Sequence, residues 1–283
     1  MLILTTYIYT ATHIREEDIV RYNPTIQPST PEHLNTYGFS IFNSLFSKDE
    51  IENLKQNCVE KNYESLKSHI LNHPKLQDMI QQITTSPDYV FQDYIWIIEK
   101  SSVHTCHRDN NGDFFNQGQQ HPSYTMIIYL EDMGDKCLTV IPRSQENINS
   151  YFTNFNNALQ NIQCKKGDII LFNANLIHAG TITEKENNIR IQLKITHKDD
   201  IPYIDYYQNY NKVLDKENPY PNYIRKIQQN ISCVVPGLAN LTQKENIRTA
   251  RGSQNGVNIG FPQKMFSYMF YGNQDYYDLP NAF

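Results

Sequence analysis

Two short motifs constrain this chain more than any other feature of its sequence. In the first, His107-Arg108-Asp109, an imidazole and a carboxylate stand two residues apart. Residues two apart in an extended strand point to the same side, so these side chains can face one point. The second motif contributes another imidazole, His178, far along the chain. Two imidazoles and one carboxylate can bind a divalent metal from one side and leave the opposite side open. The fold must therefore bring a strand end next to a distant loop.

The sequence around His178 is compatible with this role. His178 ends the run CKKGDIILFNANLIHAG, which is typical of a turn, a buried strand over 169–172 and a loop closed by glycine. Arg190 and Gln192 share one face of the next expected strand, 189–196. The guanidinium of Arg190 can bind a carboxylate through two hydrogen bonds, as a co-substrate at the metal would require. Arg190 could instead be a cation at a strand edge, but the strand is otherwise apolar, which favours a buried partner.

Further polar residues near these motifs are weaker candidates. His104 lies three residues before His107, a spacing that does not place both rings on one face, so we expect His104 outside the metal ligands. Strand parity allows Tyr94, Thr125 and Tyr129 to point inward and hydrogen-bond the same co-substrate. Taken without His178 and Arg190, the first motif would be interpreted as a surface turn.

The hydrophobic pattern predicts helices before a series of short strands. Ser47 and Glu50 form a capping box at the start of an amphipathic helix, and two more helices are expected before residue 84. Prolines predict a loop over 21–36. The strands expected from β-branched and aromatic content are 1–10, 37–42, 89–100, 124–130, 137–141, 169–172 and 189–196. The polar loop from 110 to 122 is expected to contact substrate.

This order of elements predicts a fold that is mainly β with flanking helices. Short strands separated by Gly, Pro and Asn turns favour a jelly-roll barrel, and the double-stranded β-helix is the cupin-like version that holds a metal in its mouth. We expect residues 1–200 to form this domain together with its N-terminal helices. Residues 201–283 are rich in Tyr, Asn and Pro and are expected to be a C-terminal elaboration that packs on the barrel or forms oligomer contacts. It contains one expected helix over 223–231 and a capping box at Thr242.

Composition narrows the setting and the partners. The net charge of −5 provides no general basic field, which disfavours nucleic acid as a partner. Five cysteines, an odd number without a CxxC motif, predict neither a disulfide framework nor a zinc ribbon. Reduced cytoplasm is then the simplest location. No apolar run approaches the ~20 residues that cross a bilayer, so no membrane association is expected, and the oligomeric state stays open.

Three stretches resemble a known enzyme family. TMIIYLEDMGDKCLTVIPRSQ, KKGDIILFNANLIHAG and NNIRIQL resemble the core of the phytanoyl-CoA dioxygenase-like branch of the Fe(II)/2-oxoglutarate oxygenases, and YGFSIFNSLFSKDEIENLK resembles its opening strand and helix. The resemblance covers about 36–198. It implies that His107, Asp109 and His178 bind Fe(II) and that Arg190 binds the distal carboxylate of 2-oxoglutarate. It also implies hydroxylation of a substrate by dioxygen, with release of succinate and CO2.

The sequence departs from the family pattern at one place, and two alternative functions stay open. Where the family usually has Pro-Gly-Ser-His, this chain has Pro142-Arg143-Ser144-Gln145 on the substrate side. Asp109 favours hydroxylation, since related halogenases replace this carboxylate with a small residue. One alternative is a catalytically silent cupin-like barrel that binds a ligand or partner. Another is a cupin-type hydrolase or isomerase, which would need further His or Glu ligands. The substrate could be a small molecule, a lipid-like acyl group or a protein side chain.

Overall fold

The computed structural model describes most of the chain. The described residues are 29–43, 45–100, 103–109, 119–133, 137–146, 159–182, 188–203, 209–215, 217–234 and 261–273. The strand expected over 1–10, most of the loop that follows Asp109 and the capping box at Thr242 lie outside these ranges.

Helices flank the sheets at both ends of the described chain. They are α2 (Pro31–Tyr37), α3 (Lys48–Val59), α4 (Tyr63–Leu71), α5 (Pro74–Thr84), α7 (Asn222–Val234) and α9 (Phe261–Tyr271), with short 3₁₀ turns η1 (Ser144–Glu146) and η2 (Lys198–Asp200). The predicted capping box is confirmed: the Ser47 hydroxyl accepts from the Glu50 amide, and the Glu50 carboxylate accepts from the Ser47 amide.

Helix α2 corrects the loop predicted over 21–36. The side chain of Thr30 caps this helix by accepting from the amide of His33, and Pro31 occupies its first turn, where a missing N–H costs nothing. Gly38 ends the helix with φ of 86°, a left-handed conformation suited to glycine. Proline therefore marks a helix start here rather than a loop.

The strands form two sheets. They are β1 (Phe39–Phe42), β2 (Tyr89–Phe91), β3 (Tyr94–Ile98), β4 (Tyr124–Tyr129), β5 (Leu138–Val140), β6 (Gln160–Ile162), β7 (Ile169–Asn173), β8 (His178–Gly180), β9 (Arg190–His197) and β10 (Tyr210–Leu214). The larger sheet has the order β1-β7-β4-β9-β3-β10, with β2 also paired to β9, and the smaller sheet has the order β6-β5-β8. The single strand expected over 89–100 is thus divided into β2 and β3.

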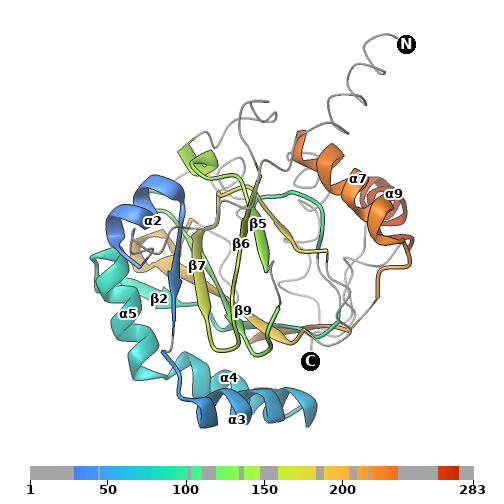
Figure 1. Cartoon of the computed structure of the whole chain (residues 1–283). Helices are drawn as coiled ribbons and strands as arrows, with labels where there is room; N and C mark the ends of the chain where they lie inside the picture. Colours follow the sequence, from blue (N-terminus) through green and yellow to red (C-terminus); the bar gives the residue numbers. More distant parts are fainter. Residues whose placement is uncertain are drawn as a thin grey trace.

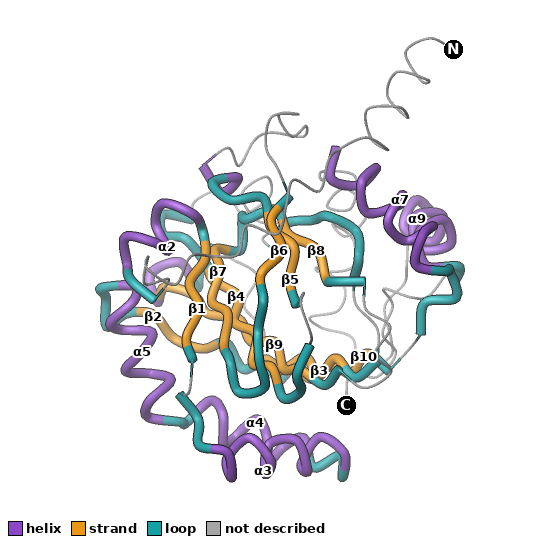
Figure 2. The backbone as a smooth tube through the Cα atoms, viewed as in Figure 1, coloured by secondary structure: helices purple, strands orange, loops and turns teal. Residues whose placement is uncertain are grey.

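The inner faces of the two sheets pack on each other, as Figure 2 shows for β5, β6 and β8 over the larger sheet. Ile127 and Phe172 of the larger sheet share one buried cluster with Leu138 and Val140 of the smaller sheet. This arrangement confirms the predicted jelly-roll, or double-stranded β-helix, fold with its flanking helices.

The outer face of the larger sheet is covered by helices. Leu54 of α3 and Leu66 of α4 are fully buried in one cluster with Ile97 and Leu193, which point outward from β3 and β9. Burying such a side chain contributes about 1.5–3 kcal/mol. Figure 1 shows α3, α4 and α5 on this side, and α7 with α9 at the other side of the barrel.

Residues beyond 200 contribute directly to the barrel. Strand β10 pairs in parallel with β3, in a register that sets Tyr210 beside Tyr94, and it was not predicted. The helix expected over 223–231 is confirmed as α7. No helix in the described ranges is long and apolar enough to span a membrane.

Candidate metal centre

The two imidazoles of the sequence motifs are brought together by a pair of backbone hydrogen bonds. The amide of His107 donates to the carbonyl of His178 at 2.9 Å, and the amide of His178 donates back at 3.0 Å. This isolated antiparallel bridge places both side chains on one side, with ring centroids 4.4 Å apart. Both residues are buried.

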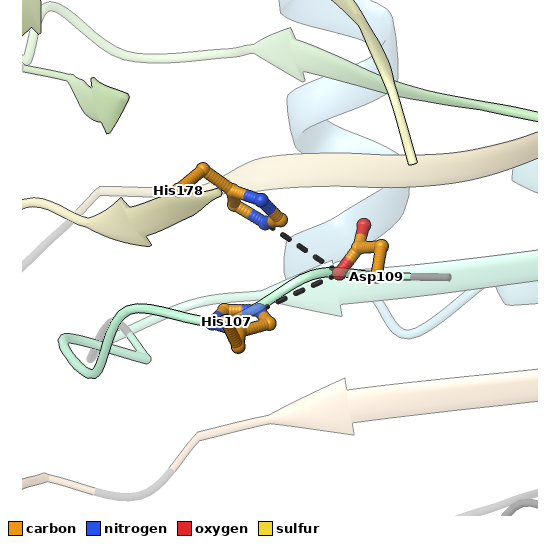
Figure 3. Close-up of side chains that lie close together, drawn as sticks. All are labelled: His107, Asp109 and His178. Atoms are coloured by element: carbon orange, nitrogen blue, oxygen red, sulfur yellow. Dashed lines mark ion pairs between the residues drawn. The ribbon is translucent and has the colours of Figure 1, made fainter. Parts of the chain in front are cut away.

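Backbone carbonyls determine which ring nitrogens face the site. Nδ1 of His107 lies 2.8 Å from the carbonyl oxygen of Thr105, and Nδ1 of His178 lies 2.9 Å from that of Leu176. A carbonyl only accepts hydrogen bonds, so Nδ1 carries the proton in both rings and the Nε2 lone pairs are left to bind a metal. Both Nε2 atoms point to Oδ1 of Asp109, at 3.4 and 3.5 Å (Figure 3).

The other carboxylate oxygen of Asp109 is surrounded by hydrogen-bond donors. Oδ2 accepts hydrogen bonds from the Thr125 hydroxyl at 2.6 Å and from the Gln192 amide at 3.2 Å, and it forms an ion pair with the Lys194 ammonium at 3.1 Å. Thr125 lies on β4, and Gln192 and Lys194 lie on the adjacent β9. Asp109 thus presents Oδ1 to the imidazoles while Oδ2 is held by the larger sheet.

Electrostatics favour the protonation states that bind metal. Burial alone would raise the pKa of Asp109, but the Lys194 ammonium, followed by the neighbouring His178 and His107, outweighs it and holds this pKa well below its usual range. Burial and the neighbouring His107 lower the pKa of His178, more than Asp109 raises it. A carboxylate and a neutral imidazole are the forms that ligate a metal. The donor set therefore fits a divalent transition metal such as Fe(II), with positions left open opposite the protein.

Arg190 lies on the same face of β9 as Gln192 and Lys194, because residues two apart alternate to one side. It is buried, and its guanidinium donates to the carbonyl oxygen and the side-chain oxygen of Asn188 at 3.1 and 2.7 Å. Arg190 and Gln192 are two positions apart in the strand, so their Cα atoms are about 7 Å apart. A cation thus lies further along the barrel from the carboxylate of Asp109.

The remaining predicted contacts line the same face. Tyr129 is paired with Arg190 across β4 and β9, and its hydroxyl donates to the carbonyl oxygen of Cys137 at 3.2 Å. Tyr94 is buried on β3 and shares a face with Trp96, whose register partner is Gln192. Their contact with a co-substrate stays a prediction, as do the roles of the other site residues.

Lys194 was missed by the sequence reasoning, although a usable signal was present. It follows Gln192 by two positions, and the alternation that placed Arg190 and Gln192 on the inner face applies to it equally. His104 has partners other than the metal-ligand side chains: its Nε2 lies 2.9 Å from the side-chain oxygen of Gln228, and its ring packs on Tyr271.

The segment before His107 is bound by the C-terminal helices. The Thr105 hydroxyl is hydrogen-bonded to the Tyr271 hydroxyl of α9 at 2.7 Å, and the amide of Cys106 donates to the Ser232 hydroxyl of α7 at 2.8 Å. We call these contacts of residues 104–106 with α7 and α9 the C-terminal clamp. They hold the backbone whose carbonyl fixes the His107 ring.

A disulfide between Cys106 and Cys233 completes the C-terminal clamp. The cysteine count predicted no disulfide framework, and this single pair was not foreseen. Their Cα atoms lie 4.8 Å apart, within the usual range for a disulfide. An odd number of cysteines excludes complete pairing but allows one pair, and residues separated by 127 positions gave no local signal.

A second cluster of metal-ligand side chains, also unpredicted, contains His121, His197 and Asp199. The two rings stack with centroids 3.7 Å apart and planes 23° from parallel. Imidazole lone pairs lie in the ring plane, so in nearly parallel stacked rings they do not converge on one ion. We assign no metal to this cluster.

The family model for phytanoyl-CoA dioxygenase (PhyH) matches residues 35–184, more than half of the chain. No curated protein sequence matches the chain.

Solved structures with a similar backbone include the non-haem α-ketoglutarate-dependent epimerase SnoN from nogalamycin biosynthesis, at TM-score 0.49 and 12% identity over 62% of this chain and 82% of that one. They also include EctD from S. alaskensis with bound Fe, at TM-score 0.49 and 13% identity over 60% of this chain and 76% of that one.

Proposed function

We propose, from the premise that this chain belongs to the phytanoyl-CoA dioxygenase family, that it hydroxylates a substrate at Fe(II) held by His107, Asp109 and His178. The family consists of Fe(II)- and 2-oxoglutarate-dependent oxygenases, so the general reaction class and the two cofactors follow from membership. The choice of hydroxylation and the individual ligand assignments are our proposal.

One observation carries this proposal: two Nε2 atoms and one carboxylate oxygen of buried residues face a single point. An exposed acidic cluster would be common without function, but a buried convergence of neutral imidazoles on a carboxylate is costly unless a ligand binds there. Bound Fe(II) supplies the one-electron and O2 chemistry that side chains lack.

Arg190 supports 2-oxoglutarate as the co-substrate. This dicarboxylate needs one end at the metal and the other at a fixed cation. Arg190 supplies a buried cation on the β9 face that also carries Gln192, a hydrogen-bond donor to Asp109. We propose that Arg190 binds the distal carboxylate, and that Tyr94 and Tyr129 line the space between.

The balance of the proposed reaction is simple. One oxygen atom of O2 enters a substrate C–H bond as a hydroxyl, and the other enters the co-substrate, which is released as succinate and CO2. The role of the chain is to orient both molecules and exclude water. The three metal-binding side chains, present and oriented together, argue against a silent barrel, which would have no need to retain them. The substrate stays open between a small molecule and a protein side chain.

Titration of the anaerobic Fe(II) protein with 2-oxoglutarate, followed by the metal-to-ligand absorption band, tests the proposal. Losing one partner of a buried charge pair costs about 3–5 kcal/mol, so Arg190→Ala should lower 2-oxoglutarate affinity about a hundredfold or more. Arg190→Lys keeps the charge but loses the two-pronged geometry and should weaken binding while metal content stays unchanged. Arg143→Lys, at an exposed arginine paired with Glu146, is the matched control.

Metal stoichiometry tests the ligand assignment separately. His178→Ala and Asp109→Ala should lose tight Fe(II) binding, while His69→Ala, at an exposed histidine, should keep it. Equal metal content in the parent and both ligand variants would overturn the assignment. No absorption band in the iron-loaded parent would remove 2-oxoglutarate, and equal affinity in Arg190→Ala would remove Arg190 from the site. Mass spectrometry of candidate substrates for a product heavier by one oxygen would identify the reaction.

A further inference from the structure

The two oxygens of the Asp109 carboxylate have different surroundings. Oδ1 faces the imidazoles of His107 and His178, and Oδ2 accepts two hydrogen bonds and forms an ion pair with Lys194. A carboxylate oxygen has two lone pairs, and the hydrogen bonds from Thr125 and Gln192 occupy both, while the Lys194 ammonium lies 3.1 Å away and attracts the charge of Oδ2. The side chain is only 7% exposed, so water has little access to replace these donors.

The register of the larger sheet brings these donors together. Thr125 of β4 and Lys194 of β9 are direct register partners, and their side chains therefore share one face. The Lys194 ammonium lies 3.2 Å from the Thr125 hydroxyl as well as 3.1 Å from Oδ2. The hydroxyl accepts from the ammonium and donates to the carboxylate. The three groups therefore form a closed ring of two charge-assisted hydrogen bonds and one ion pair, in which each contact fixes the next.

We propose that Lys194 is a positioning residue that, with Thr125, restricts Asp109 to binding the metal through Oδ1 alone. This inference rests on the proposed function of the same site. Neither the family match nor the resemblance of motifs assigns a role to Lys194.

Binding through a single oxygen of Asp109 matters because it determines how many coordination positions of the metal stay open. A six-coordinate metal held by His107, His178 and one oxygen of Asp109 keeps three positions for exchangeable ligands. A chelating co-substrate would need two of them and would leave one for the oxidant. If Oδ2 also bound the metal, one of the three positions would be lost, and the co-substrate would compete with the carboxylate. Lys194 thus protects co-substrate binding rather than metal binding.

The test separates these two affinities in one set of proteins. Lys194→Met removes the ammonium but keeps a long unbranched stem, and Lys194→Arg keeps a cation within reach. Lys198→Met makes the same substitution four residues later, at an exposed lysine whose partner is Asp88. Each protein is titrated anaerobically with Fe(II) and then with 2-oxoglutarate, and the absorption band is followed.

Lys194→Met should retain metal at the parent's stoichiometry while its affinity for 2-oxoglutarate falls about tenfold or more. Lys194→Arg should recover most of the loss, and Lys198→Met should match the parent. A purely structural role would lower the unfolding temperature and weaken metal and co-substrate binding together, which would overturn the proposal. Unchanged 2-oxoglutarate affinity in Lys194→Met would also overturn it.

A second variant keeps the test decisive if Lys194→Met does not fold. Thr125→Val removes the shortest hydrogen bond to Oδ2 and is expected to give the same separation, with metal retained and 2-oxoglutarate weakened. Parent-like 2-oxoglutarate binding in Thr125→Val would then refute the inference. The parent titration separates this failure from that of the proposed function: a parent without an absorption band contradicts the function. A parent with a band and variants that keep it contradict only the role of Lys194.

Discussion

The C-terminal clamp predicts that a hydroxyl on the last described helix affects metal binding. Tyr271→Phe removes the hydroxyl that lies 2.7 Å from the Thr105 hydroxyl, where both residues are fully buried. Breaking a hydrogen bond between buried groups costs about 1–3 kcal/mol of unfolding free energy. Thr105 also holds the His107 ring through its carbonyl, and loss of such outer partners lowers metal affinity about 10- to 100-fold. We expect Tyr271→Phe to show both effects, with about a tenfold loss of metal affinity.

A double-mutant cycle measures the contact directly. Denaturant unfolding of the metal-free parent, Tyr271→Phe, Thr105→Val and the double variant should give a coupling energy of about 1 kcal/mol. Competition titration with a coloured chelator then measures the metal affinity of each protein. Tyr220→Phe is the matched control, because its hydroxyl contacts a carbonyl of the same helix α9 at an exposed position. A coupling energy below about 0.3 kcal/mol, the limit of additivity, or parent-like metal affinity in Tyr271→Phe would refute the reasoning.

Two further predictions concern stability. Hydrogen bonds from Ser47 and His73 lower the pKa of Glu50 to about 2, below its ordinary value of 4.5, so its contribution is complete above pH 4.5 and is lost as pH falls toward 2. Glu50→Gln should therefore flatten the unfolding free energy over that range in acid titrations, and an unchanged slope would contradict this origin. Gly38→Ala should destabilise more than Gly167→Ala in denaturant unfolding, although φ is positive at both. A methyl group at Gly38 would collide with Gln145 and lie 2.7 Å from Leu176, whereas at Gly167 the nearest atom is 3.6 Å away. Each substitution should cost about 1 kcal/mol for backbone strain, with the excess at Gly38 measuring the collision; equal losses would contradict the steric account.

Features that depend on a few neighbouring residues could be predicted from the sequence. The capping box at Ser47 and the buried strand before His178 depend on a few neighbouring residues, and both are confirmed. The convergence of His107, Asp109 and His178 was also foreseen, because strand alternation and a glycine-bounded loop restrict where these side chains can point. The division of the chain at residue 200 stays a prediction.

Contacts between residues far apart in the sequence could not be predicted from local sequence patterns. Cys106 and Cys233 are joined across 127 positions, and β10 reaches its partner β3 only through the tertiary fold. Helix α2 was missed for a different reason, since Pro31 is compatible with both a loop and a helix start, and the cap from Thr30 decides between them. The position of Lys194 on the inner face was foreseeable. Its ion pair with Asp109 was not, because only the tertiary fold brings the segment that follows His107 to β9.

The pairing of β10 with β3 also affects how the chain assembles. Before residues 210–214 have been synthesised, β3 has β9 on one side and an unpaired row of backbone groups on the other. Its sequence, YIWII, has no charge and a high β-propensity, so during synthesis this edge is a template for pairing with another chain. The strand that finally covers it, YNKVL, carries a lysine, a residue typical of a protected edge. A chain shortened at residue 200 would keep every proposed metal ligand and yet expose this edge, so its expected fate is aggregation.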